Sequence, residues 1–405
     1  MLAPERRTRA DILAAVAIAV VVAVAVVVVW VNSDARATTS EPAARAVTPP
    51  TTALALPQAL RELWREPDGA STRALSASGV AITGDGGTVT GRDPQTGQQV
   101  WKYQRDLPLC GVESQFGTVI ATYRDDRGCS QTTLLAADTG ARRTARSSYM
   151  DRQVTLSVDG TYTLARGSDR LEVWRSDLVR TLEYGYVDAP INVRTQPRTD
   201  CTHLSAASGT TRLAVLERCP GDAANRLTVL NPAPKDNTVP EEYGSHVLTE
   251  PGAASDKARV VAVSDNRIAL YLPGTDTAAP EFAIFDQGGN PVGSHRLTAP
   301  LADGITTTRV GSAFLVFTGN SLIALSATTF DPLWTASDAL GSPALMAGRI
   351  LMPVVDGIAV VDPATGAQTD RIPVQRNNYR GEPISLSVTG STILERRGTD
   401  LYALG

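Results

Sequence analysis

The four cysteines carry the most specific chemical signal in the sequence, because thiols form disulfides or bind metals. None of Cys110, Cys129, Cys201 and Cys219 belongs to a C-x-x-C pair, and a single neighbouring histidine, His203, is too little for a zinc site. Each first cysteine precedes a short expected strand, and each second one follows the next strand. Because the start of one hairpin strand lies beside the end of the next, we predict the disulfides Cys110–Cys129 and Cys201–Cys219. Four buried free thiols are the alternative.

Other residues with catalytic potential do not gather in the sequence. His203, His246 and His295 are few and widely spaced, and we expect each to be a surface or hydrogen-bonded residue. The charged run Arg124–Arg127 is typical of a solvated loop beside a cysteine. We therefore predict no catalytic, cofactor-binding or metal-binding residues, and a protein that is not an enzyme.

The elements that must position these residues are strands. From about residue 58, short apolar runs alternate with Gly, Asp, Asn and Thr, without a helical period. One strand-plus-turn unit recurs. An apolar residue stands four positions before the turn, and a small or aliphatic residue two positions before it, so both lie on one strand face. The turn-opening residues of the units are Asp93, Asp138, Arg175, Asn231, Asp286, Ser326, Asp362 and Gly405.

This repeat predicts an all-β propeller over 58–405. The mean spacing is about 45 residues, the length of a four-stranded blade, and radial stacking covers both faces of each sheet. The last unit, 400–405, stops where an outer strand should follow, and Leu60–Trp64 resembles that missing strand. We therefore predict eight blades, with the N-terminal strand completing the last one. Seven blades are the alternative, because the unit boundaries within 187–300 are unclear.

The units resemble the PQQ-like β-propeller repeat, L-x-A-L-D-x-x-T-G-x-x-x-W, which quinoprotein dehydrogenases share with the assembly lipoprotein BamB. The resemblance is sharpest at 87–106, 320–337 and 356–374. It implies a membrane-anchored bacterial member of this superfamily. It also implies that Trp64, Trp101 and Trp334 dock each blade on its neighbour. The adjacent cysteine pair expected of a quinoprotein dehydrogenase is missing, so the resemblance implies no bound quinone.

The N-terminal region has the pattern of a signal-anchor. Residues 12–31 are uncharged and apolar, and about 20 such residues span a hydrocarbon core of about 30 Å. The basic residues Arg6, Arg7 and Arg9 place the segment 1–11 in the cytoplasm. A flexible linker is expected over 32–57. The alternative is a signal peptide cleaved near Ala35-Arg36-Ala37.

These features predict a scaffold rather than a catalyst. The net charge of −4 gives no general attraction to nucleic acid. We expect a single-pass protein of the cytoplasmic membrane whose extracytoplasmic propeller binds an unknown envelope protein. The alternatives are a lipid or small-ligand carrier that uses the central channel, and a degenerate quinoprotein dehydrogenase. The long segments 232–252 and 273–281 are either disordered insertions or contact surfaces.

We predict that a reporter active only outside the cytoplasm is active when fused after Gly405. The mature protein should also retain Arg6, because the apolar run is longer than the core of a signal peptide, which has about 7–15 residues. N-terminal sequencing of the purified membrane protein measures this. A mature chain that begins at Thr38 would show cleavage and contradict the anchor.

Overall fold

The protein is an all-β ring of eight sheets preceded by one helix. The computed structural model describes residues 8–31, 33, 36–188, 190–377 and 379–405. Most of the predicted cytoplasmic segment 1–11 lies outside these residues. The helix α1 (Arg9–Val31) contains the predicted span, and the Thr8 hydroxyl accepts a hydrogen bond from the Asp11 amide at its start. α1 is long and apolar enough to cross a membrane, a property that N-terminal signal sequences share.

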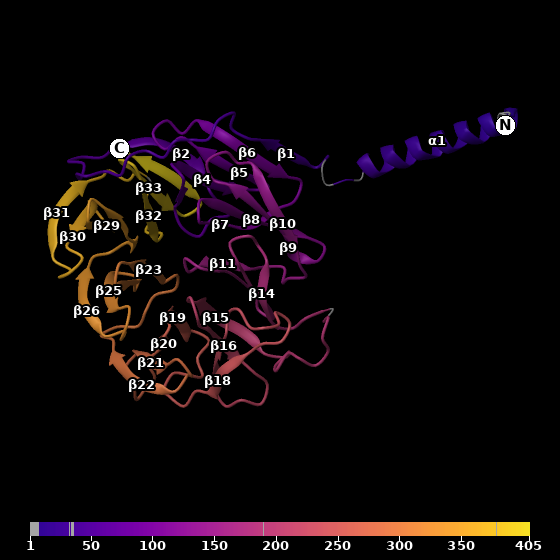
Figure 1. Cartoon of the computed structure of the whole chain (residues 1–405). Helices are drawn as coiled ribbons and strands as arrows, with labels where there is room; N and C mark the ends of the chain where they lie inside the picture. The colour runs from indigo at the N-terminus through magenta and orange to yellow at the C-terminus, as the bar shows by residue number, and fades with distance from the viewer. Residues whose placement is uncertain (1–7, 32, 34–35, 189, 378) are drawn as a thin grey trace.

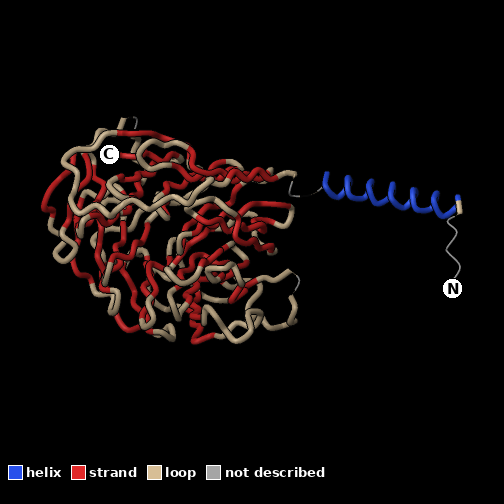
Figure 2. Tube along the Cα trace, turned by 45° about the horizontal axis from the view of Figure 1, so that its top comes forward, coloured by secondary structure: helices blue, strands red, loops and turns tan. Residues whose placement is uncertain are grey.

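Figure 1 shows the ring with α1 extending away from it, and Figure 2 shows the same separation after rotation. Within a blade the strands are antiparallel and follow the chain from the channel outward. Blades 1 to 4 are β3 (Leu75–Ala77), β4 (Val80–Asp85), β5 (Thr88–Arg92) and β6 (Gln99–Arg105); β7 (Leu109–Gln115), β8 (Thr118–Asp125), β9 (Gly128–Ala136) and β10 (Arg142–Ser147); β11 (Thr155–Val158), β12 (Thr163–Arg166), β13 (Arg170–Trp174) and β14 (Arg180–Gly185); β15 (Thr202–Ser208), β16 (Leu213–Arg218), β17 (Arg226–Leu230) and β18 (Glu242–Val247).

Blades 5 to 8 continue the same order around the ring. Their strands are β19 (Arg259–Val263), β20 (Arg267–Leu272), β21 (Glu281–Asp286) and β22 (Pro291–Arg296); β23 (Thr306–Val310), β24 (Ala313–Phe317), β25 (Ser321–Ser326) and β26 (Pro332–Ser337); β28 (Ala344–Met346), β29 (Arg349–Val354), β30 (Gly357–Val361) and β31 (Gln368–Pro373); β32 (Ile384–Thr389), β33 (Thr392–Arg397), β34 (Asp400–Leu404) and β2 (Glu62–Pro67). The short β27 (Gly341–Ser342) pairs in parallel with β32.

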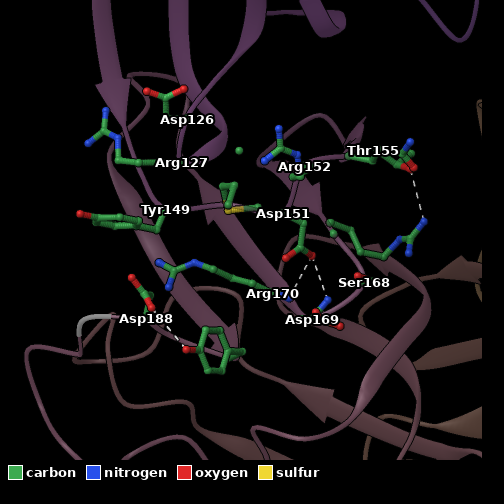
Figure 3. A pocket seen from close by; sticks show the side chains of 16 residues that line it. Asp126, Arg127, Tyr149, Asp151, Arg152, Thr155, Ser168, Asp169, Arg170 and Asp188 are labelled. Carbon is green, nitrogen blue, oxygen red and sulfur yellow. Dashed lines mark hydrogen bonds between the residues drawn. The ribbon is translucent and has the colours of Figure 1, made fainter.

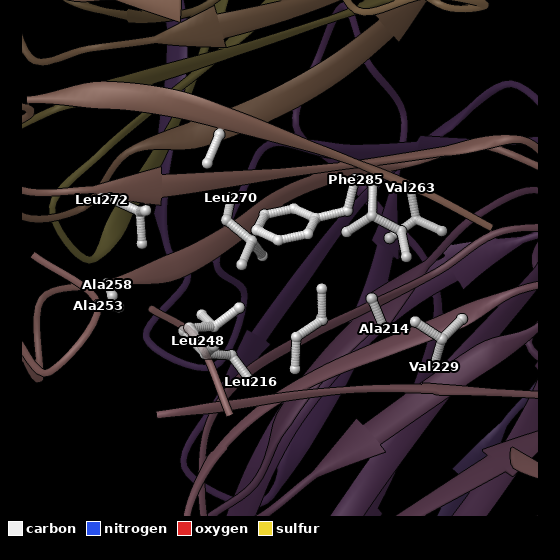
Figure 4. Close-up of a cluster of buried hydrophobic side chains, with 13 residues drawn as sticks. Ala214, Leu216, Val229, Leu248, Ala253, Ala258, Val263, Leu270, Leu272 and Phe285 are labelled. Atoms are coloured by element: carbon white, nitrogen blue, oxygen red, sulfur yellow. The ribbon is translucent and has the colours of Figure 1, made fainter. Parts of the chain in front are cut away.

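The repeated unit of the sequence forms the third strand of every blade. In β25, for example, Leu322 and Ala324 are fully buried on one face, as the period of two predicts. The core lies between neighbouring sheets. Figure 4 shows one such layer, where Leu216 and Val229 of blade 4 meet Phe285 of blade 5. Each sheet therefore buries apolar side chains only because another sheet stacks on it.

The two ends of the chain close the ring. β2 pairs with β34, so the N-terminal strand is the outer strand of blade 8. The main chains of Arg61 and Gly405 exchange two hydrogen bonds, of 3.2 and 3.1 Å. This pairing confirms the predicted eight blades and excludes the seven-bladed alternative.

The expected linker over 32–57 is not free along its whole length. Residues 32, 34 and 35 lie outside the described part of the chain. Beyond them, β1 (Thr38–Glu41) pairs with β6 and adds a fifth strand to blade 1. Leu56 then packs against the core of blades 7 and 8. The prediction of a flexible tether is wrong from Thr38 onward, because the outer edge of β6 offers unpaired main-chain groups that β1 satisfies.

Tryptophans dock three blades on their neighbours. Each indole stacks on the turn between the third and fourth strands of the next blade, where the glycine has positive φ and approaches the ring too closely for a Cβ atom. Each indole N–H also donates to a main-chain carbonyl of that turn. The contacts are Trp64 to Pro94 and Gly97, Trp101 to Ala137 and Gly140, and Trp334 to Pro363 and Gly366.

We predict that Trp101→Ala lowers the free energy of unfolding by about 3–5 kcal/mol, because it removes a fully buried ring between blades 1 and 2. Trp101→Phe should lower it less, since the ring remains and mainly the 2.8 Å hydrogen bond to Ala137 is lost. Denaturant unfolding followed by circular dichroism measures both. Equal stability of Trp101→Ala and wild type would show that the docking contributes nothing.

Candidate functional site

The described part of the chain encloses two large hollows. One is the central channel, lined mainly by the innermost strands of the blades. The other is a cleft on the face of the ring that carries the loops leading from one blade to the next. We call this face the inter-blade face. It also carries the turns between the second and third strands of each blade, whereas the opposite face carries the turns between the first and second and between the third and fourth strands.

The central channel has a volume of about 1120 Å³. Its wall is rich in hydroxyl groups, and the Thr306 and Ser342 hydroxyls lie 2.6 Å apart. Arg73 forms an ion pair with Glu113 at the wall, and that carboxylate is almost fully buried. The wall also contains aliphatic residues, among them Leu156, Val261 and Leu386, so the channel could hold a small ligand of mixed polarity.

The cleft lies between blades 2 and 3 and has a volume of about 840 Å³. Two tyrosines and a mixture of arginines and aspartates line it (Figure 3). They come from two strand connections and two inter-blade loops. Their main members are Arg127, Tyr149, Asp151, Arg152, Arg166, Asp169, Arg170, Tyr186 and Asp188.

Asp151 fixes the floor of the cleft. Its Oδ2 accepts hydrogen bonds from the main-chain amides of Asp169 and Arg170, at 2.9 and 3.3 Å. Gly128 packs so closely on the Met150 carbonyl that a Cβ atom would lie 1.9 Å from it, and its φ is +96°. Because of these contacts the loop 148–154 is held against both blades, so the cleft is preformed.

A buried ion network lies behind the cleft. Arg170 donates to Glu172 at 2.7 Å and to Glu183 at 2.9 Å. Burial alone would raise the pKa of Glu172, but Arg146, Arg170 and Arg180 lower it to about 2. Glu172 is therefore charged throughout the physiological range, and it holds Arg170 in place rather than exchanging protons.

The rim of the cleft presents groups that a ligand can contact. The guanidinium of Arg127 lies 5.5 Å from the ring centre of Tyr149. Tyr186 donates to Asp188 at 3.3 Å. Both tyrosine side chains are about half exposed, at 45% and 50%. The described lining residues include Ser168 but no histidine or cysteine.

The structure contains both predicted disulfides. The Cα–Cα distances are 5.9 Å for Cys110–Cys129 and 4.2 Å for Cys201–Cys219. The second bond closes the hairpin of β15 and β16. The first joins β7 to the start of β9, because the connection after β8 is so short that Cys129 already belongs to the next strand. Cys129 lies beside Gly128, so this bond fastens one edge of the cleft.

The donors of Cys201, Cys219 and Glu217 lie within 4.8 Å of one another, which resembles a metal site. Both sulfurs are committed to the disulfide and offer no thiolate. Glu217 instead accepts hydrogen bonds from Tyr184 at 2.8 Å and from Thr228 at 2.6 Å. The three residues therefore form a structural cluster.

Sequence reasoning missed most of the cleft. Of the charged run at 124–127, expected to be a solvated loop, Asp126 and Arg127 line the cleft. One signal in the sequence could have indicated the cleft. Charged residues follow the second strand in both blade 2 and blade 3, at 126–127 and 169–170, so the two charged pairs occupy equivalent positions in neighbouring blades. The segments 232–252 and 273–281 line neither hollow.

His203 departs from the expectation of a surface or hydrogen-bonded residue. Its side chain is buried, its ring stacks on Tyr184 at 5.4 Å, and neither ring nitrogen has a hydrogen-bond partner. Its Nε2 lies 3.9 Å from Glu217. Burial, with a contribution from Arg166, lowers the pKa of His203 from 6.5 to about 4. The residue is therefore a neutral, flat core group beside the second disulfide.

We predict that His203→Phe weakens the loss of stability between pH 6.5 and pH 4. Within this pH range, His203 of the wild type binds a proton in the unfolded chain but not in the folded chain. The free energy of unfolding therefore decreases as the pH falls. Phenylalanine keeps the stacking on Tyr184 and has no such proton. Melting temperatures of both proteins at pH 7 and pH 4.5 measure the effect. The same decrease in both would contradict it.

Comparison with known proteins supports the fold and nothing finer. No protein-family model and no curated protein matches the sequence. The computationally designed protein Ika8 is 12% identical, with a TM-score of 0.55, covering 87% of this chain and 99% of its own. Sqt1 of Saccharomyces cerevisiae is 9% identical, with a TM-score of 0.50, covering 90% and 99%. The dihydro-heme d1 dehydrogenase NirN is 15% identical, with a TM-score of 0.50, covering 82% and 73%. At these identities the similarity establishes a β-propeller.

Proposed function

We propose that this protein is a non-catalytic, membrane-anchored scaffold of the cell envelope that binds a protein partner in the cleft between blades 2 and 3. The observation that carries the proposal is the cleft itself. It is preformed by Asp151 and Gly128, and it presents half-exposed tyrosines between arginines and aspartates. Tyrosine and arginine are the residues that most often anchor protein interfaces.

The mixture of charges favours a polypeptide over a small ion. Arg127, Arg152 and Arg166 line the cleft together with Asp126, Asp169 and Asp188. A peptide segment carries both carbonyl acceptors and amide donors, and often both charges, so it can satisfy such a lining. The surrounding blades keep these groups in place, which reduces the entropy lost on binding.

The N-terminal helix and the disulfides support an extracytoplasmic location. α1 has the length and composition of a membrane anchor. Both disulfides close within single blades, and such bonds persist in oxidising compartments. The tryptophan docking on Asp-opened turns supports membership of the PQQ-like repeat superfamily, without its quinone chemistry.

We predict that a photo-crosslinking amino acid at Tyr149 captures a protein partner in intact cells. The matched control is Tyr243 on the outer strand β18, because both side chains are 45% exposed. The substitution Arg152→Glu should reduce capture from position 149, since it reverses the charge of an exposed cleft residue without touching the core. Mass spectrometry of the crosslinked products identifies the partner. Equal capture at both positions, or capture that Arg152→Glu leaves unchanged, would contradict the assignment of the cleft.

A further inference from the structure

A second surface of the ring is apolar and lies outside the cleft. Ile191 is 79% exposed, Val193 is 72% exposed and Val239 is 37% exposed. The first two follow β14 in the long loop 186–201, and the third belongs to the connection between β17 and β18. We call these three residues the rim patch.

The exposure of the rim patch is fixed by hydrogen bonds. Asn192, between the two aliphatic residues, donates from its side-chain amide to the Thr238 hydroxyl at 2.7 Å. The Thr195 hydroxyl donates to the Thr238 carbonyl at 2.9 Å. The segments that carry the patch are therefore pinned to each other. Because they are held in this way, the aliphatic side chains of Ile191 and Val193 remain available for contact with another apolar phase.

The point at which the chain from α1 joins the ring suggests the lipid bilayer as this apolar phase. Thr38 of β1 pairs with Arg105, so the chain from the helix enters blade 1 at the inter-blade end of β6. The loop 186–201 likewise begins at the inter-blade end of β14. Figures 1 and 2 agree that this loop and α1 leave the ring on the same side.

The tether is short. Residues 32–37 separate Val31 from β1, and the seven Cα–Cα steps from Val31 to Thr38 span at most about 25 Å at about 3.6 Å per step. A ring held so near the bilayer meets it repeatedly, so even a small apolar surface on the anchored side is presented to it at a high effective concentration. The exposed Arg194 lies beside Val193, and arginine near a bilayer surface is attracted to anionic headgroups.

We propose that the rim patch docks on the outer surface of the bilayer that holds α1 and thereby fixes the orientation of the propeller. Ile191 and Val193 enter the boundary between headgroups and acyl chains, while Arg194 lies at headgroup level. The helix supplies attachment and the patch supplies a second contact point. This inference rests on the proposed membrane anchor, but it does not depend on the cleft or its partner.

The test uses the full chain in lipid nanodiscs that contain phosphatidylglycerol and phosphatidylcholine. A polarity-sensitive fluorescent amino acid is placed at position 191, at position 193, or at the control position Val355. Val355 is 67% exposed and lies between β29 and β30 of blade 7, on the inter-blade face but away from blade 3. We expect a blue shift and quenching by headgroup-labelled nitroxide lipids at 191 and 193, and neither change at 355.

A pair of variants tests the docking itself. Ile191→Asp combined with Val193→Asp should increase the rotational freedom of the propeller on the nanodisc, measured by fluorescence anisotropy decay, because charged side chains leave the interface. Val355→Asp should leave it unchanged. Equal emission and equal quenching at 191 and 355, or protection of 191 only after a cell extract is added, would overturn the inference in favour of a solvated surface or a protein-binding surface. Loss of the full chain from the nanodiscs would overturn the anchor and this inference together.

Discussion

The pairing of β2 with β34 is the contact on which the rest of the structure depends. A four-stranded sheet of this composition cannot bury both of its faces, so each blade is stable only between two neighbours. Only a closed ring gives every blade two neighbours, and the main-chain hydrogen bonds between Arg61 and Gly405 are where this ring closes. The clasp joins the two ends of a long chain, so it converts local blade contacts into one cooperative unit.

Closure also determines how the surface is used. Because the blades are fixed, the inter-blade loops can carry charged and aromatic residues without loss of the core, as the cleft between blades 2 and 3 does. The disulfide Cys110–Cys129 and the Asp151 hydrogen bonds hold that cleft open to solvent. β1 ties the segment after the helix to blade 1, so the attachment point of α1 is on the same side of the ring as the loop 186–201.

Much of the architecture could be predicted from the sequence because it rests on local and repeated patterns. The alternation around Leu322 and Ala324, the turn glycines, and the resemblance of Leu60–Trp64 to a missing strand are all visible in the linear chain. The cysteine spacing likewise follows from hairpin geometry. The segment that begins at Thr38 is an exception. Its sequence Thr-Thr-Ser-Glu has no alternating hydrophobic pattern, so the sequence predicts a flexible linker, although the segment pairs with the edge strand β6 of blade 1.

The sequence by itself determined the strand phase of the repeat and the apolar N-terminal run, and it predicted the disulfide pairing, since each depends on residues close together or on a repeated motif. It left eight and seven blades open, and the pairing of β2 with β34 decided for eight. The tertiary structure alone decided that Tyr149, Asp151, Arg166, Arg170 and Tyr186 share a cleft, and that His203 is a buried neutral group. It also decided that Ile191 and Val193 are pinned outward beside Thr238. The physical reason is that these features join loops from different blades, and their proximity is set by how the ring closes rather than by any pattern along one strand.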